Sequence, residues 1–306
     1  MRLRLGINTC FAVKRWPRPE DWAPVVRDRL DLRLVQHSLD LVDTTTLGED
    51  LDERGEAVAR VAADHGLELH STFTGLAAYS SNLLLSPDPG DRALALAWYR
   101  KAIRFTARAG GRATGGHVGA FSVADWQEPA RRSALWDALR GALDDLALDA
   151  RSAGLAYLLV ENLAAAREPS TMAMIRELLT DGDVERTPIR LCLDVGHMCV
   201  PGTAGADRDP YAWLRALGAS APVIQLQQSD ADGDHHWPFT DRNNAIGRIT
   251  ADRVIDALAE GRVEESALIL EIIPPFEQDD EGVLDDLTSS VVYWRDALAR
   301  HGVLAD

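Results

Sequence analysis

Four polar residues stand at the ends of short apolar runs, and their types and spacing could do chemistry together. They are Glu161 in AYLLVEN, Asp194 in IRLCLDVGH, Gln227 in PVIQLQQSD and Glu271 in ALILEII. Each run is typical of a short buried strand, and a buried carboxylate is costly unless it is paired or bound to a cation. Three acids and an amide delivered in this way are oxygen ligands suited to one divalent metal ion.

Each of these residues also has an ordinary structural interpretation. Glu161 could cap a helix or form a salt bridge, and Asp194 precedes a residue pair, Val-Gly, that is compatible with a simple turn. Gln227 could equally be a hydrogen-bonded amide inside a barrel. The set of four, at the ends of successive late strands, favours a metal site over four separate coincidences. All-oxygen ligands favour Mg²⁺ or Mn²⁺, with Co²⁺ and Zn²⁺ as alternatives.

Several further residues fall at expected strand ends or in the loops that follow them. A single histidine is more often structural than catalytic, but several histidines on one face of a fold favour a functional site. His65, by contrast, stands in a helix tail beside a glycine and is expected at the surface. The residues that we expect to contact a substrate are His70, His117, His197, His236 and Trp237.

Short apolar runs alternate with helix-period segments along the whole chain. The four polar residues are separated by 33, 33 and 44 positions, which leaves room for at least one strand–helix unit between neighbours. Strands are expected near 3–7, 32–36, 67–71, 113–117, 156–161, 189–194, 222–227 and 267–272. Helices are expected near 19–28, 52–65, 91–109, 130–153, 169–179, 210–218, 250–260 and 285–301.

Eight strand–helix units predict an α/β protein that forms a single-domain (β/α)₈ TIM barrel over residues 1–306. In such a barrel the functional side chains converge from the carboxyl ends of different strands. The long connections 201–210 and 228–249 follow expected ligand strands and are therefore predicted at the same end.

Composition narrows the class of function. The net charge of −16 would repel the phosphates of nucleic acids and anionic membrane surfaces, so neither is an expected partner. Three cysteines without a CxxC pair cannot build a disulfide framework, which favours a reducing compartment. No run approaches the roughly 20 apolar residues that span a bilayer, and the first residues read as a strand rather than a leader. We therefore expect a cytoplasmic enzyme.

The chain resembles the xylose-isomerase-like TIM barrels, a family of sugar and sugar-phosphate isomerases and epimerases. The resemblance runs from LGIN at 5–8 to LILEI at 268–272, and its best matches are VEN at 160–162 and LDVGH at 193–197. A glutamine at 227 is closer to the hydroxypyruvate-isomerase branch than to the ketose 3-epimerases, which use histidine there. The resemblance implies a homodimer or homotetramer, and one divalent ion held by Glu161, Asp194, Gln227 and Glu271.

What the resemblance implies chemically is proton transfer beside a carbonyl. The metal would stabilise the enediolate of a small open-chain ketose or ketose phosphate, while Glu161 and Glu271 would remove and return the proton. Return to the same carbon would be epimerisation, and return to its neighbour would be aldose–ketose isomerisation. The glycines in residues 115–119, with Lys14, Arg15 and Arg242, are candidates for binding a phosphate, such as that of a tetrulose phosphate.

Two other functions compete with this one. Apurinic-site endonucleases share the barrel and resemble the same histidine and carboxylate pattern, in which they bind a trinuclear zinc cluster. Gln227 stands where a further zinc-binding histidine would fall, and the acidic chain offers no basic face for DNA. A sugar-binding protein without activity is the third interpretation, but binding alone does not require two acid/base glutamates.

Overall fold

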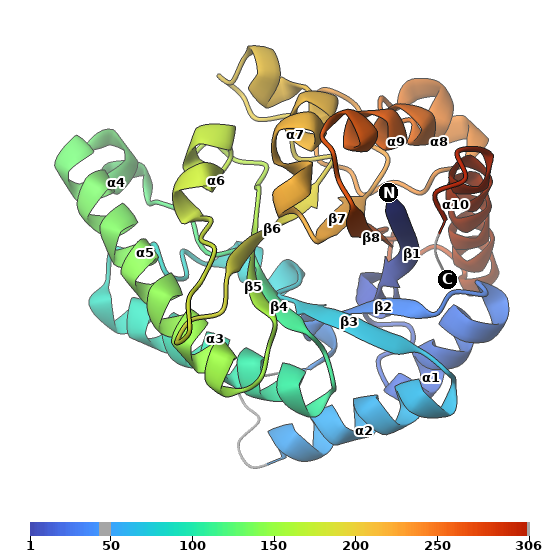
Figure 1. Cartoon of the computed structure of the whole chain (residues 1–306), viewed down its shortest axis with the longest axis horizontal. Helices are drawn as coiled ribbons and strands as arrows, with labels where there is room; N and C mark the ends of the chain where they lie inside the picture. Colours follow the sequence, from blue (N-terminus) through green and yellow to red (C-terminus); the bar gives the residue numbers. More distant parts are fainter. Residues whose placement is uncertain (43–49, 305–306) are drawn as a thin grey trace.

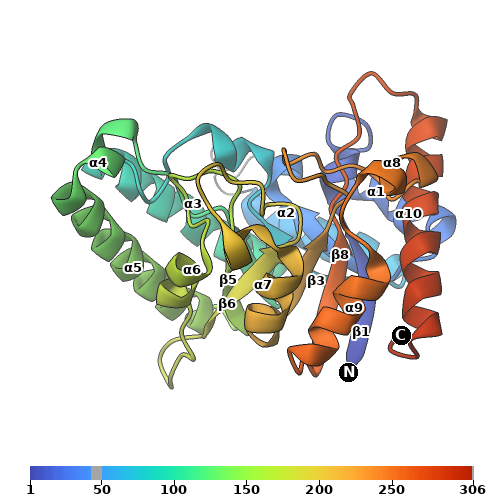
Figure 2. The same cartoon turned by 90° about the horizontal axis from the view of Figure 1, so that it is seen from above.

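The computed structural model describes residues 1–42 and 50–304. Its eight strands form one closed parallel barrel in which each strand pairs with the next in sequence and β1 pairs with β8. This arrangement confirms the predicted (β/α)₈ fold (Figures 1 and 2). The strands are β1 (Arg2–Asn8), β2 (Leu34–Ser38), β3 (Glu68–Phe73), β4 (Ala113–Gly116), β5 (Tyr157–Glu161), β6 (Ile189–Asp194), β7 (Val223–Leu226) and β8 (Glu265–Leu270).

Helices surround the barrel and connect successive strands. The last helix, α10, runs along the side of the barrel near β1 and brings the C-terminal segment back to the start of the chain, where Leu3 N–H donates to Val303 O over 2.9 Å (Figure 2). The helices are α1 (Pro19–Pro24), α2 (Leu51–Asp64), α3 (Pro89–Arg108), α4 (Val123–Gln127), α5 (Pro129–Ser152), α6 (Met172–Leu178), α7 (Pro210–Leu217), α8 (Asp241–Ile246), α9 (Ala251–Glu260) and α10 (Asp280–Arg300).

Element boundaries differ from the sequence prediction where local capping decides them. Helix α10 begins five residues earlier than expected because Asp279 caps it, accepting a hydrogen bond from Gly282 N–H over 2.8 Å. The short helices α4 and α8 were not predicted, because five or six residues are too few to show a helical period. None of the described helices is long and apolar enough to cross a membrane.

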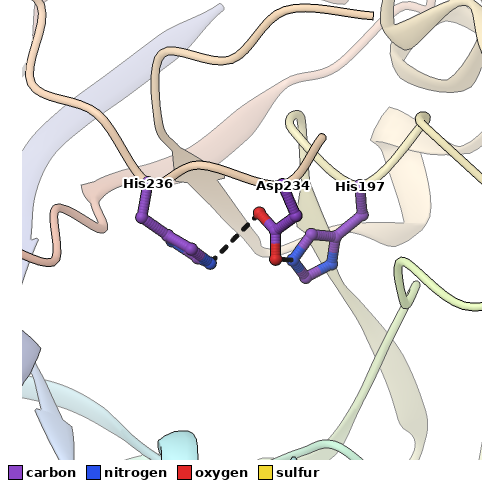
Figure 3. A group of neighbouring side chains, drawn as sticks. All are labelled: His197, Asp234 and His236. Carbon is purple, nitrogen blue, oxygen red and sulfur yellow. Dashed lines mark ion pairs between the residues drawn. The ribbon is translucent and has the colours of Figure 1, made fainter. Parts of the chain in front are cut away.

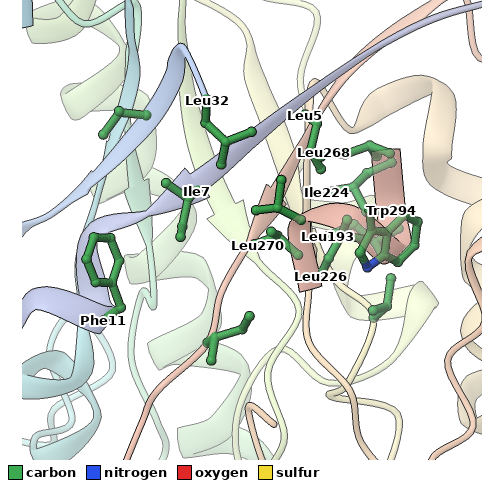
Figure 4. Close-up of a cluster of buried hydrophobic side chains, with 14 of the residues drawn as sticks. Leu5, Ile7, Phe11, Leu32, Leu193, Ile224, Leu226, Leu268, Leu270 and Trp294 are labelled. Carbon is green, nitrogen blue, oxygen red and sulfur yellow. The ribbon is translucent and has the colours of Figure 1, made fainter. Parts of the chain in front are cut away.

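The main hydrophobic core lies between the outer face of the barrel and the helices. Leucine and isoleucine side chains from β1, β6, β7 and β8 meet Trp294 of α10 there, and Trp294 is fully buried (Figure 4). Burial of such side chains stabilises the fold by roughly 1.5–3 kcal/mol each. The barrel interior has its own smaller apolar cluster, which includes Phe73, Leu159 and Ile269.

The interior also contains a layer of hydrogen-bonded amides. Asn8 and Gln225 both donate to Gln36 Oε1 over 3.0 Å, and Gln36 in turn donates to Ser71 Oγ over 3.2 Å. Asn8 also donates to Glu271 Oε1 over 3.0 Å. Through Asn8, the amide layer therefore fixes the carboxylate of Glu271, one of the two predicted catalytic glutamates.

His37 of β2 is a buried neutral histidine outside the barrel interior. Its ring lies between Trp22 and Phe105, with centroid distances of 5.6 and 5.8 Å. Burial lowers its pKa from 6.5 to about 4. Between pH 6.5 and about 4, His37 is therefore protonated in the unfolded chain but neutral in the folded chain. The stability of the fold consequently falls as pH falls through this range.

We predict that His37→Phe makes the protein less sensitive to acid. At pH 5 the unfolded state of the wild type is stabilised by protonation of His37, which lowers its free energy of unfolding by roughly 2 kcal/mol relative to neutral pH. The variant has no histidine at this position and does not lose this free energy. Thermal unfolding between pH 7.5 and pH 5 checks the prediction, with His65→Gln at the end of α2 as the control that retains the wild-type slope. Equal acid sensitivity in His37→Phe and wild type would contradict it.

Candidate active site

The four residues singled out by their spacing meet at the carboxyl end of the barrel. Glu161 and Asp194 are the last residues of β5 and β6, while Gln227 and Glu271 directly follow β7 and β8. Their exposed fractions are 0, 0, 0 and 3%. Possible ligand atoms of Glu161, Asp194 and His197 lie within 4.8 Å of one another, and so do those of Asp194, His236 and Glu271.

Three buried atoms in this cluster have no hydrogen-bond partner among the described residues. They are Glu161 Oε1, His197 Nε2 and Glu271 Oε2. Buried polar atoms are almost always paired, so three unpaired atoms in one cluster need an explanation. Carboxylate oxygens and an imidazole nitrogen are ligands of divalent cations. The residues present therefore fit one divalent ion at this position.

Electrostatics favour proton uptake by both glutamates. Burial raises the pKa of Glu161 to about 8; the Asp194 charge adds to this effect, and His197 opposes it. Burial, together with the charges of Asp194 and Glu161, also raises the pKa of Glu271 well above its usual value. Carboxyl groups shifted in this way can exchange protons near neutral pH, which is what an acid/base pair requires.

Tyr79 hydrogen-bonds one of the two carboxylate oxygens of Glu161. It belongs to the 3₁₀ helix η4 (Leu76–Ser80), and its hydroxyl donates to Glu161 Oε2 over 2.9 Å. Its ring also packs against His117, with 4.5 Å between ring centroids. No motif surrounds Tyr79, and 82 positions separate it from Glu161, so sequence alone gave no signal for this contact.

The LDVGH segment orients Asp194. Asn162 pairs with the backbone of Asp194 through two hydrogen bonds of 2.9 Å, which ties the ends of β5 and β6 together. Gly196 N–H donates to Asp194 Oδ1 over 2.6 Å. A Cβ on Gly196 would lie 2.3 Å from Gln227 Cδ, so only glycine lets the two strand ends approach this closely.

His197 points its Nε2 atom into the cluster. Its Nδ1 atom lies 2.6 Å from Asn162 O, which identifies Nδ1 as the donor and fixes the ring. Its Nε2 atom lies 3.3 Å from Asp234 Oδ2. Burial opposes protonation of His197, but the charges of Asp194 and Asp234 outweigh it and raise its pKa well above 6.5.

Asp234 is a site residue that the sequence analysis missed. It lies in the loop after β7, between His197 and His236, and its two oxygens face one ring each (Figure 3). Burial raises its pKa, but the facing histidines outweigh burial and lower it below its usual range. The only available signal was the DGDHH segment, where an acid precedes two histidines.

Gln227 reaches the cluster, but it turns its amide nitrogen toward the acids. Nε2 donates to Asp194 Oδ1 over 3.1 Å and to Asp234 Oδ1 over 2.7 Å. Its oxygen accepts the backbone N–H of His236 over 2.6 Å. In this structure the side chain of Gln227 therefore links Asp194, at the end of β6, to Asp234 and His236 in the loop after β7.

The remaining predicted residues lie at different distances from the cluster. His117 borders it: its ring contacts Tyr79, and its Nε2 lies 3.2 Å from Glu168 Oε1. Trp237 stacks on His235 at 3.9 Å between ring centroids.

The structure corrects the expected position of His70. The prediction ended its strand at residue 71, whereas β3 continues to Phe73. A register shift between β2 and β3 leaves His70 without a partner in β2, which is the pattern of a β-bulge. Its Nε2 lies 3.2 Å from the hydroxyl of Tyr157, the first residue of β5. His70 is therefore part of the barrel wall, toward the opposite end from the acids.

Close packing explains part of the glycine-rich segment 115–119, which begins within β4. A Cβ on Gly115 would lie 1.9 Å from Leu159 O, and His117 N–H already donates to Thr74 Oγ1 over 3.0 Å. Arg15 is also engaged, because its guanidinium donates to Asp280 and to the carbonyl of Gln278 over 2.6 Å each. A phosphate site at these residues stays a prediction.

Comparisons with known proteins give one consistent picture. Residues 33–287 match the family model described as xylose isomerase-like TIM barrel. The chain is 28% identical over 300 residues to D-erythrulose 1-phosphate 3-epimerase of Brucella abortus (strain 2308), covering 96% of both proteins.

Solved structures extend the likeness. A candidate xylose isomerase from Rhodospirillum rubrum superposes with a TM-score of 0.88 at 35% identity, over 96% of this chain and 99% of that one. An L-ribulose 3-epimerase superposes with a TM-score of 0.68 at 20% identity, over 98% of this chain and 94% of the other, and shows the shared fold.

We predict that Glu161→Gln stabilises the protein when a chelator is present. The pKa of Glu161 lies at about 8 in the folded chain and near 4.5 in the unfolded one, so its contribution to stability is full below 4.5 and is lost as pH rises toward 8. At pH 8 the variant should be more stable than wild type by roughly 4 kcal/mol.

Thermal unfolding at pH 5 and pH 8 checks this prediction. The exposed Glu264→Gln variant is the control and should follow wild type at both values. The gain in Glu161→Gln should shrink at pH 5, where wild-type Glu161 is protonated as well. If Glu161→Gln were less stable than wild type at pH 8, the ionised carboxylate of Glu161 would not destabilise the fold, which would contradict the prediction.

Proposed function

This chain belongs to the xylose isomerase-like TIM barrel family, and from that premise we propose that it is an epimerase of a small ketose or ketose phosphate. The observation that carries the proposal is the pair of buried carboxyl groups of Glu161 and Glu271, both with raised pKa. They come from β5 and β8, three strands apart around the barrel. A substrate between them would meet one carboxyl group on each side, as inversion at one carbon requires.

The substrate class follows from the relatives. The Brucella protein matches this chain along nearly its whole length, and its name specifies 3-epimerisation of a four-carbon ketose phosphate. We propose a ketose of similar length, with its carbonyl at C2 and the inverted hydroxyl at C3. This choice selects epimerisation over aldose–ketose isomerisation.

The chain's own residues supply the proton transfer. One glutamate takes the proton from C3, the C–H electron pair becomes part of an enediolate, and the other glutamate returns a proton to the opposite face of the same carbon. The product differs from the substrate only in configuration, so no oxidant or co-reactant is needed. Tyr79 holds Glu161 by donating to Oε2, and Asn8 holds Glu271 by donating to Oε1.

A divalent ion fits this scheme. The oxygens of Glu161, Asp194 and Glu271 would hold it, and when bound it would polarise the carbonyl and stabilise the negative charge of the enediolate. His197 lies beside these acids with its Nε2 atom 3.3 Å from Asp234 Oδ2, and we propose that it contacts a substrate hydroxyl. His117 and His236 are proposed as further substrate contacts at the rim.

The structure weakens the competing phosphoesterase interpretation. That interpretation requires His70 near the metal cluster, whereas His70 contacts Tyr157 in the barrel wall. It also requires a nitrogen ligand from residue 227, whereas Gln227 presents a protonated amide nitrogen to the acids.

We predict exchange of a substrate proton with solvent. Incubation of the protein with erythrulose 1-phosphate and Mn²⁺ in D₂O should place deuterium at C3, with inversion there, as proton NMR and mass spectrometry would show. Glu161→Gln and Glu271→Gln keep an oxygen but lose the acid/base group, so their exchange rates should fall by roughly 10²-fold or more. Glu264→Gln, exposed at the other end of β8, is the matched control and should exchange like wild type.

Other outcomes separate the alternatives. Deuterium at C1 of unphosphorylated erythrulose, with an aldose as product, would indicate an isomerase, and release of inorganic phosphate from erythrulose 1-phosphate would indicate a phosphoesterase. Binding of several short ketose phosphates with no exchange on any of them would contradict the proposed epimerase.

A further inference from the structure

The 3₁₀ helix η4 presents different side chains to its two sides. In a 3₁₀ helix, residues i and i+3 share a face because the repeat is three residues. Leu76 and Tyr79 border the same small cavity as Glu271, whereas Ala77 and Ser80 border a separate cavity. The position and rotation of η4 therefore decide whether the Tyr79 hydroxyl reaches the site.

The outer side of η4 is weakly packed. The cavity that Ala77 and Ser80 border has a volume of about 550 Å³ and extends to Leu94 and Trp98 of α3. Side chains beside a cavity lack the van der Waals contacts that packed neighbours would supply. Packing against α3 therefore contributes little to holding η4, and other interactions must fix it.

Asp40 supplies the cap that η4 lacks. The first N–H groups of a helix have no partner within it, and Gly75 at the N-cap position has no side chain to accept from them. Asp40 lies in the 3₁₀ helix η3 (Leu39–Leu41) after β2. Its Oδ2 accepts the Leu76 N–H over 2.7 Å, and its Oδ1 accepts the Ala77 N–H over 3.0 Å. One carboxylate thus holds two consecutive backbone groups, which fixes both the position and the rotation of η4.

The two loops are shaped for this contact. Gly75 has a φ of +78°, and a Cβ there would lie 2.5 Å from Asp40 Cγ, so only glycine lets the carboxylate come this close to the helix. Ser38 Oγ donates to Asp40 Oδ2 over 3.2 Å, and Thr9 Oγ1 accepts the Ser38 N–H over 2.9 Å. Asp40 is therefore itself held by the end of β2.

We propose that Asp40 is a positioning residue for the carboxyl group of Glu161 and that it acts through Tyr79. The contacts run from the Asp40 carboxylate through the backbone of η4 to the Tyr79 hydroxyl, which donates to Glu161 Oε2 over 2.9 Å. Without the Asp40 carboxylate, η4 can shift toward the cavity behind it and move the Tyr79 hydroxyl away from Glu161. The effect on catalysis rests on the proposed function, in which Glu161 exchanges a proton with the substrate, whereas the effect on η4 does not.

The first measurement is C3 proton exchange on erythrulose 1-phosphate with Mn²⁺, in wild type, Asp40→Ala, Tyr79→Phe and the double variant. Asp40→Ala should lower kcat by roughly tenfold or more and leave KM within about twofold, because a shift of about 1 Å in a catalytic group is enough for such a loss. Tyr79→Phe should lower kcat by a similar factor. The double variant should be no slower than Tyr79→Phe, since Asp40 acts through Tyr79.

Asp88→Ala is the matched control. Asp88 lies in the same connection between β3 and α3 and caps α3, where it accepts the Gly90 N–H over 2.6 Å. Its removal also deletes a capping carboxylate and lowers stability. The kcat of Asp88→Ala should nevertheless stay at the wild-type value, because Asp88 does not hold η4.

The second measurement does not depend on the reaction. Hydrogen–deuterium exchange of peptides from 74–82, followed by mass spectrometry, should be faster in Asp40→Ala, because the Leu76 and Ala77 N–H groups lose their acceptor. Asp88→Ala should exchange like wild type in this segment. Asp40→Asn keeps one side-chain oxygen as an acceptor, so it should lie between wild type and Asp40→Ala in both measurements.

The outcomes separate this inference from the proposed function. Unchanged kcat or unchanged amide exchange in Asp40→Ala, or a double variant in which the two losses multiply, would overturn the inference and leave the epimerase proposal standing. If wild type exchanges no ketose proton, the epimerase proposal falls, and amide exchange alone decides whether Asp40 holds η4. If Asp40→Ala does not fold, Asp40→Asn takes its place, and wild-type values of kcat and amide exchange in it would overturn the inference.

Discussion

Three buried carboxyl groups and a fourth, more exposed one share one small volume at the mouth of this barrel, and their mutual repulsion is the constraint on which the rest of the site depends. Glu161, Asp194 and Glu271 come from strand ends, and Asp234 comes from a loop. Without compensation, such a cluster would destabilise the fold by several kcal/mol. The structure responds by raising the pKa of both glutamates and of His197, so that protons remain in the cluster near neutral pH. A divalent cation would satisfy the same requirement.

The surrounding structure holds the acids together despite this repulsion. Asn8, in the amide layer beneath the site, fixes Glu271, Tyr79 fixes Glu161, and Asn162 joins the ends of the two strands that carry Glu161 and Asp194. These supports are hydrogen bonds from neutral groups, which add no charge to the cluster. Strain stored in this way is typical of catalytic sites, where stability is lower so that reactive groups can be close together.

Much of this could be predicted from sequence, because strand periodicity and strand-end acids are local features. The barrel and the convergence of Glu161, Asp194 and Glu271 follow from them. The position of His70 could not be predicted, since it depends on a bulge that appears only when β2 and β3 pair. Tyr79 and Asp234 lie in irregular segments whose paths depend on tertiary contacts. Even the role of Gln227 depends on one backbone N–H that the sequence does not locate.

The central claim is that the strand-end acids form one metal centre. Anomalous diffraction at the manganese edge, from crystals of the unmodified protein grown with Mn²⁺, tests it most directly. The account predicts a single peak per chain within roughly 2.0–2.6 Å of an oxygen of each of Glu161, Asp194 and Glu271. A peak that contacts none of these acids, or three separate peaks as in a trinuclear cluster, would contradict it.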